Sequence, residues 1–152
     1  MITLQQIKEF TENYFECEDL RTKSRKQDFV FAKNMAFYLA RKYTDATTSR
    51  IGKEIADKDH ATVLHSLNKF ESYIKAETLK GNPMYPEEFN QILKCETIFN
   101  KFINSLLEEI RVFSESQEKF KTLINHMINN DLKDKAKELN DFLDDFMKHL
   151  SN

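Results

Sequence analysis

The sequence has few of the residues that build turns and metal or disulfide sites. Its 152 residues include only two Gly, two Pro, two Cys and no Trp. So little turn material excludes sheet sandwiches and barrels, and it favours a mostly helical chain. Cys17 and Cys95 lie far apart and match neither a disulfide framework nor the spacing of zinc ligands. We therefore expect a protein of a reducing, cytoplasmic setting, without a bound metal.

Long apolar runs and glycine-rich phosphate loops are also absent. No stretch of 18 apolar residues occurs, and the first ten residues lack the basic and apolar regions of a signal peptide. The motif GxxxxGK[ST], which cradles nucleotide phosphates, does not occur either. We expect neither a membrane partner nor a nucleotide partner.

Residues for catalysis are not arranged in any recognisable pattern. His60 and His65 are five residues apart and so fall on different faces of a helix, which disfavours a metal pair. We expect His60 to be a hydrogen-bonding groove residue and His65 a partly buried helix-packing residue. Because no nucleophile is paired with a base, we expect no enzyme activity and no cofactor.

Charge is distributed unevenly along the chain. Residues 1–82 carry 14 Lys and Arg against 12 Asp and Glu, net +2, whereas residues 83–152 carry 9 and 13, net −4. Residues 21–53 hold nine basic side chains and only two acidic ones, a local net charge of +7. A solvated helix face usually mixes both signs, so this density favours a surface that binds phosphates.

Apolar residues recur at helical spacing through the first half. The pattern predicts helices over about 4–15 and 26–43, a short helix within 47–56 and a longer helix that starts after Asp59. Thr3 with Gln6 fits a capping box, and Asp59 fits an N-cap. Asp57 is the residue best suited to a left-handed turn between the last two helices. A short helix, a tight turn and a longer helix form the helix-turn-helix outline.

Gly81-Asn82-Pro83 is the strongest break in the chain, and Pro86 follows it closely. We place the domain boundary there, with one domain over residues 1–82 and a second over 86–152. Beyond it, apolar residues spaced three and four apart predict one long helix or two in series, with a possible break at 114–117, and then a final helix. The fold class expected is all-α, a helix-turn-helix domain followed by a helical hairpin or small helical bundle.

Three blocks in the first half carry a more specific signal. They are Arg25 to Leu39 (RKQDFVFAKNMAFYL), Ile51 to Glu54 (IGKE) and Lys58 to Ser66 (KDHATVLHS). In this order and at these separations they resemble the C-terminal DNA-binding domain of the bacterial replication initiator DnaA, a helix-turn-helix domain of the Trp-repressor type. The resemblance covers about residues 2–76 and does not include the initiator's ATPase domain.

The resemblance implies a role for each matching position. Arg25 matches the loop arginine that enters the minor groove, where a guanidinium reads groove width and A·T edges. The start of the recognition helix matches positions that touch base edges in the major groove. The implied base contacts are Arg25, Asp59, His60, Ala61 and Thr62. The implied phosphate contacts, which set register without reading sequence, are Lys23, Lys26, Lys33, Asn34, Arg41, Thr48, Ser49 and Lys58.

The chain also departs from the family pattern. Ala61 stands where the family usually has threonine, Thr48-Ser49 replaces Leu-Pro, and Ala56-Asp57 replaces the glycine pair of the turn. The function expected is sequence-preferring binding of double-stranded DNA, in a nucleoid-associated protein of a bacterium or phage that regulates transcription or replication. The alternative is a protein-interaction module with an initiator-like fold that has lost DNA binding.

Residues 86–152 admit three interpretations of their apolar seam. The helices can close on each other as a hairpin, form a homodimer or bind another protein. Dimerisation has a functional advantage, because a single helix-turn-helix makes few base contacts and gains affinity from a second half-site.

Overall fold

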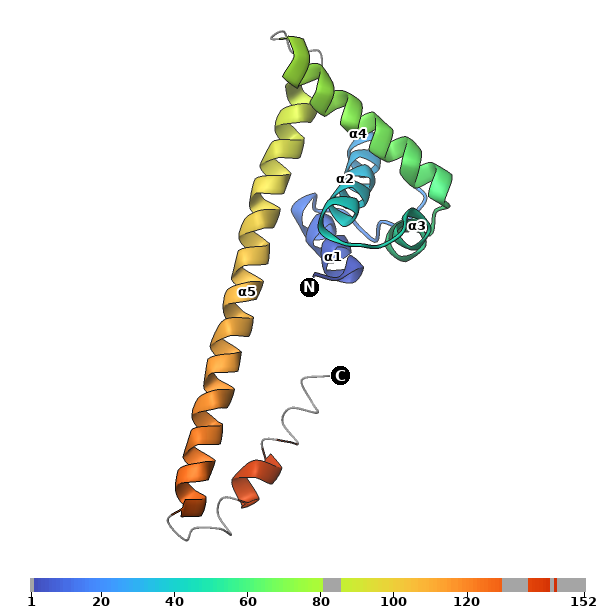
Figure 1. The fold of residues 1–152 in the computed structure, drawn as a ribbon. Coiled ribbons are helices and arrows are strands. Elements are labelled where there is room, and N and C mark those ends of the chain that lie inside the picture. Colours follow the sequence, from blue (N-terminus) through green and yellow to red (C-terminus); the bar gives the residue numbers. More distant parts are fainter. Residues whose placement is uncertain (1, 81–85, 130–136, 143, 145–152) are drawn as a thin grey trace. The chain divides into compact units, whose positions relative to one another are not determined.

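The computed structural model describes residues 2–80, 86–129, 137–142 and 144, and its contacts divide the chain into two compact units, Met1–Ile103 and Asn104–Asn152. All regular structure among the described residues is helical, which confirms the expected all-α class (Figure 1). The helices are α1 (Leu4–Tyr14), α2 (Gln27–Tyr43), α3 (Thr48–Ala56), α4 (His60–Lys80) and α5 (Pro86–Asn129). Residues 137–142 are also helical.

Side chains just before the helices explain where two of them begin. The Thr3 hydroxyl accepts a hydrogen bond from the Gln6 amide at 3.2 Å, and the Gln6 side chain accepts one from the Thr3 amide at 2.9 Å, which confirms the capping box. The Thr47 hydroxyl caps α3 by accepting from the Arg50 amide at 3.3 Å. These bonds satisfy amides that have no partner within the helix.

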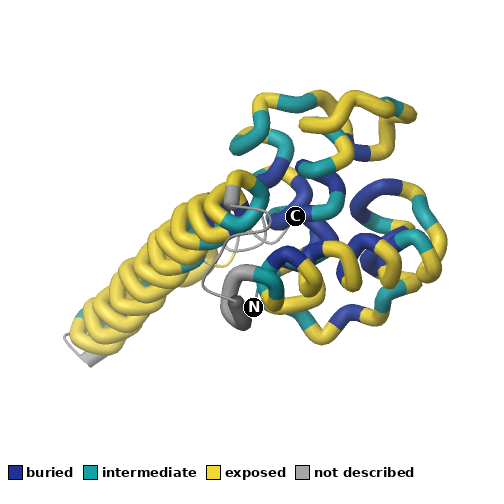
Figure 2. The backbone as a smooth tube through the Cα atoms, turned by 90° about the horizontal axis from the view of Figure 1, so that it is seen from above, coloured by how far each residue is buried: buried dark blue, intermediate teal, exposed yellow. Residues whose placement is uncertain are grey.

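The core of the first unit lies where α2 contacts α1, α3 and α4. Most of the buried residues of α2 are apolar, and Met35, Phe37 and Leu39 are fully buried. Figure 2 shows the buried positions gathered in this unit, while much of α5 is exposed. Burying one such side chain stabilises the fold by about 1.5–3 kcal/mol, so α2 organises the unit.

The first turns of α5 belong to the same core. Ile92, Cys95 and Phe99 are fully buried, and the Phe99 ring lies 4.8 Å from Phe10 and 5.0 Å from Tyr43 between ring centroids. The division between units therefore falls at Ile103, inside α5, rather than at the expected boundary over 81–86. A break in the sequence marks the end of a helix, whereas a unit extends as far as its buried contacts do.

Polar contacts reinforce this attachment. The Glu96 carboxylate pairs with the Lys42 ammonium and accepts a hydrogen bond from the Tyr43 hydroxyl at 3.0 Å. Burial, and then the bond to Glu96, raises the pKa of Tyr43. Burial also raises the pKa of the Cys95 thiol to about 12, so this cysteine is a packing residue.

The second unit is exposed over most of its described length. Helix α5 runs through 114–117 without a break, which decides for one long helix over two in series. Among the apolar residues of α5 that belong to the second unit, Ile124 is buried, while Leu107, Ile110 and Val112 are at least half exposed. Most apolar positions of the expected final helix, among them Leu132, Leu143, Phe146 and Leu150, lie outside the described residues. None of the described helices combines the length and the apolar character needed to cross a lipid bilayer.

Replacing Phe99 by Ala tests the attachment of α5. Loss of this fully buried ring should destabilise the first unit by about 3–5 kcal/mol, as removal of a core phenylalanine does. Phe113→Ala, on the same helix but partly exposed, should change the unfolding free energy of that unit by much less. Urea unfolding followed by circular dichroism measures both. Equal effects of the two substitutions would contradict the boundary at Ile103.

Candidate nucleic-acid interface

The turn between α3 and α4 depends on a close backbone approach. A Cβ atom on Gly52 would lie 2.4 Å from the Lys58 carbonyl oxygen and 3.0 Å from a Val63 methyl group. The Lys58 amide in turn donates a hydrogen bond to the Gly52 carbonyl at 2.9 Å. The glycine of the Ile51-Gly52 pair is therefore required by packing, because no other residue lets the turn lie this close to α3.

Asp57 has the left-handed conformation predicted for this turn, with φ of 49°. Its carboxylate pairs with the Lys53 ammonium one helical turn earlier, and this bond holds the pKa of Asp57 below its ordinary value. Aspartate tolerates the left-handed region better than most residues, so the turn forms without a second glycine.

Asp59 caps the helix that follows, as predicted. Its Oδ1 accepts a hydrogen bond from the Thr62 amide at 2.8 Å, and this bond is the main cause that lowers the pKa of the Asp59 carboxyl. One carboxylate oxygen thus stabilises the helix start. The Asp59 side chain itself lies at an exposed position.

The first two turns of α4 present an open face. His60 and Ala61 are exposed, and Thr62 is half-buried. His65 is also exposed, so the expectation that it packs partly buried is wrong. Leu64, one helical turn after His60, is 45% exposed and is not among the residues predicted from the sequence. The i, i+4 spacing from His60 to Leu64 and from Ala61 to His65 is the signal that could have found both.

The basic loop before α2 is tied to the rest of the domain at its first residues. Leu20 is fully buried, and its amide donates to the Glu12 carboxylate at 2.8 Å. The Arg21 guanidinium donates to the Glu54 carbonyl of α3 at 3.0 Å. Farther along the loop, Lys23 and Arg25 are exposed.

The predicted contact residues are brought together only in part. Arg25 and Asn34 line one hollow of about 250 Å³, together with Lys69, Phe70 and Tyr73 of α4. Lys58 is half-buried and close enough to Lys33 to lower the pKa of the Lys33 ammonium, after burial as the first cause. The remaining phosphate candidates are exposed or half-buried and lie at Lys26, Arg41, Thr48 and Ser49.

Lys33 differs from the other predicted phosphate contacts. Its side chain is buried, with 9% of the residue exposed, and its ammonium donates to the Thr22 carbonyl at 3.3 Å. The sequence predicts a surface position for this residue because lysine is rarely buried. No spacing rule distinguishes this lysine from a surface one.

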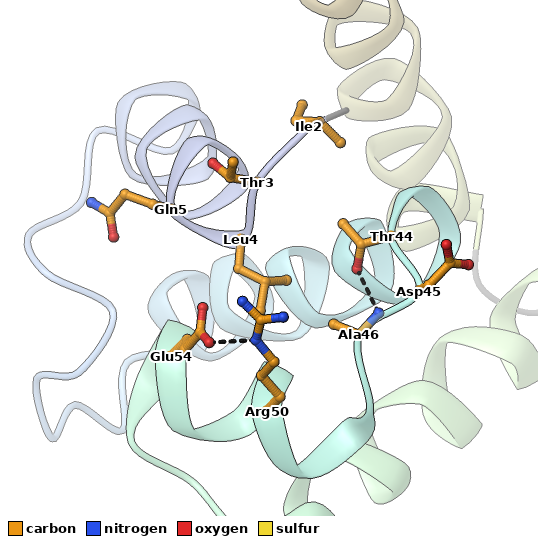
Figure 3. Close-up of a pocket in the computed structure, with 9 residues that line it drawn as sticks. All are labelled: Ile2, Thr3, Leu4, Gln5, Thr44, Asp45, Ala46, Arg50 and Glu54. Carbon is orange, nitrogen blue, oxygen red and sulfur yellow. Dashed lines mark hydrogen bonds and ion pairs between the residues drawn. The ribbon is translucent and has the colours of Figure 1, made fainter. Parts of the chain in front are cut away.

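A second hollow, of about 380 Å³, lies between the start of α1, the connection from α2 to α3, and α3 itself (Figure 3). Its lining includes the ion pair of Arg50 with Glu54, 2.6 Å between Nε and Oε1. None of the predicted DNA-contact residues lines it. Among the described residues, no group of three or more His, Cys, Asp or Glu is arranged to hold a metal ion.

Gly52→Ala tests the packing of the turn. The added methyl group meets backbone rather than a movable side chain, so we expect a loss of about 1–3 kcal/mol in the free energy of unfolding. Ser49→Ala, at an exposed position in the same helix, should change stability by less than about 0.5 kcal/mol. Chemical denaturation of both variants provides the measurement. A Gly52→Ala protein as stable as the parent would show that the close approach is not required.

Comparison with known proteins agrees with this geometry. Residues 4–70 match the family model described as the bacterial dnaA protein helix-turn-helix. The chain is 38% identical over 103 residues to the chromosomal replication initiator protein DnaA of Bacteroides thetaiotaomicron, covering 66% of this chain and 20% of that protein. The same protein of Bacteroides fragilis is 38% identical over 101 residues, which are 65% of this chain and 21% of that protein. The protein of Lactobacillus delbrueckii is 38% identical over 79 residues, which are 51% of this chain and 17% of that protein. The chain thus spans about a fifth of the length of these relatives. Residues 4–70 are thus similar to the helix-turn-helix of bacterial dnaA proteins.

Proposed function

We propose that the first unit binds double-stranded DNA with a preference for sequence, α4 entering the major groove by its N-terminal end and the basic loop reaching the adjacent minor groove. The observation that carries this proposal is the open face of α4 at His60 and Ala61, next to a turn held by Gly52. A helix can read base edges only if its first turns project from the domain at a fixed angle. The similarity to the helix-turn-helix of bacterial dnaA proteins supports the same function.

The charge pattern is consistent with this orientation. The net +7 of residues 21–53 is carried by the loop, α2 and α3, near which the phosphates flanking the groove would lie. The first turns of α3 and α4 also have backbone amides without partners inside the helix, and helix N-termini favour phosphate oxygens. The relatives are named chromosomal replication initiators, which favours control of replication over control of transcription.

A selection from random duplexes with the purified full chain tests the proposal. We expect an enriched motif. His60→Ala should weaken the free energy of binding to the preferred site by about 1–3 kcal/mol, because the variant no longer hydrogen-bonds a base edge. It should also relax the base preference at one or two base pairs. Arg25→Ala should instead reduce the preference for A·T base pairs at a neighbouring step.

Substitutions in the second unit provide matched controls. His126→Ala and Arg111→Ala remove the same residue types from α5 and should leave the motif unchanged. If no motif is enriched and duplexes bind no better than other polyanions, the alternative function, a protein-interaction module, is favoured.

We also propose that residues 104–129 pair with a second copy of the chain. The apolar residues of this segment follow a heptad repeat with two apolar positions. One position is occupied by Ile103, Ile110 and Ile124, and the other by Leu106, Phe113, Phe120 and Met127. β-Branched residues such as isoleucine at one apolar position of a heptad favour two-stranded coiled coils. Ile110 and Phe120 remain 57% and 42% exposed, so this surface is available to a partner.

Sedimentation of the full chain tests this pairing. A dimer is expected for the parent, and Ile110→Asp should shift it toward monomer because desolvating a charge in the seam is unfavourable. Glu109→Lys, at the adjacent exposed position, is the control for a change of charge alone. A parent that is monomeric with and without DNA would contradict the pairing.

A further inference from the structure

Lys33 carries a charged group into the interior of the first unit. The residue is 9% exposed, and its ammonium lies 5.0 Å from the centre of the Phe29 ring. Burial of an ammonium is unfavourable unless hydrogen bonds and aromatic faces replace part of its hydration. The hydrogen bond to the Thr22 carbonyl supplies the first and the Phe29 ring supplies the second.

The Thr22 carbonyl belongs to a loop segment that is already ordered. The Thr22 amide donates to the Asp19 carbonyl at 2.8 Å, and the Arg21 amide donates to the Asp19 carboxylate at 2.9 Å. The Asp19 carboxylate also pairs with the Lys8 ammonium of α1 at 2.9 Å. Lys33 therefore joins α2 to a turn that α1 holds from the other side.

Arg21 makes a separate connection to the helix-turn-helix. Its guanidinium donates to the Glu54 carbonyl in the last turn of α3, where carbonyls lack partners within the helix. The end of α3 leads through Lys58 into α4, and Gly52 fixes that approach. The loop that carries Arg25 is thus joined to both α2 and the helix pair that carries His60.

We propose that Lys33 and Arg21 are positioning residues, which hold the basic loop so that Arg25 and the start of α4 can engage adjacent grooves at the same time. The inference rests on the proposed function. It assigns Lys33 to the loop rather than to a phosphate. An anchored loop loses less conformational entropy when Arg25 enters the groove, so the anchors contribute to affinity without touching DNA.

The salt dependence of binding separates this role from a direct interaction with phosphate. Removing one ion pair between the protein and a phosphate reduces the slope of log K against log salt by about one. Arg41→Ala, which removes an exposed cation of the same helix, should show that reduction with base preference unchanged. Lys33→Met should retain the parent's slope but bind roughly 3- to 10-fold more weakly, mainly at the A·T step read by Arg25.

Two further variants test whether the weaker binding of Lys33→Met is caused by a loss of folding. Arg21 is exposed, so Arg21→Ala should fold and reproduce the weaker binding at the A·T step. Lys33→Arg should restore much of the preference, because a guanidinium can donate to the same carbonyl and lie over the same ring. In an Arg25→Ala background, Lys33→Met should cause little further weakening at that step.

Amide hydrogen exchange of the DNA-free protein tests the anchor independently of binding. Exchange over residues 20–24 should be faster in Lys33→Met and unchanged in Arg41→Ala. Unchanged exchange in Lys33→Met, or a slope reduced by about one with preference retained, would overturn the inference. Failure of the parent to bind any duplex would instead overturn the proposed function, while the exchange result would still decide whether Lys33 holds the loop.

Discussion

The close approach of Gly52 to Lys58 is the constraint on which the interface depends. The contact joins two backbones, so no rotamer change can relieve it, and it sets the angle at which α4 leaves the turn. Every side chain on the open face of α4 takes its direction from that angle. The hydrogen bond from the Lys58 amide to the Gly52 carbonyl then keeps the polar groups of the turn satisfied.

The proposed phosphate-binding surface must also hold like charges together in the absence of DNA. Part of the local charge is neutralised by short-range pairs on the same helices, such as Lys53 with Asp57. Another part is buried, since the Lys33 ammonium is directed at a carbonyl and an aromatic ring. The lowered pKa of Lys33, caused first by burial and then by Lys58, shows that this arrangement is unfavourable for the charged form. Such a free-energy cost is tolerated where the buried group orders the segment that it contacts.

Local features of the fold could be predicted from the sequence because they depend on neighbours along the chain. The capping box of Thr3 with Gln6, the cap at Asp59 and the left-handed Asp57 each involve residues within four positions of one another. The exposure of His65 and the burial of Lys33 depend on which elements pack against them, so residue type alone predicts neither. The end of the first unit could not be predicted for the same reason, because Phe99 is buried by Phe10 and Tyr43, which are distant in sequence.

The departures from the family pattern differ in what they change, the backbone of the turn or the side chains at the surface. Ala56 is fully buried and Asp57 adopts the left-handed conformation with its charge paired to Lys53, so the turn closes without the family's glycine pair. The replacement at 56–57 therefore gives no reason to expect a different angle for α4. Thr48, Ser49 and Ala61 have accessible side chains, and their replacement changes which donors, acceptors and methyl groups face outward. If the proposed function holds, the angle of α4 would be that of the family, and a difference from the relatives would lie in the bases preferred.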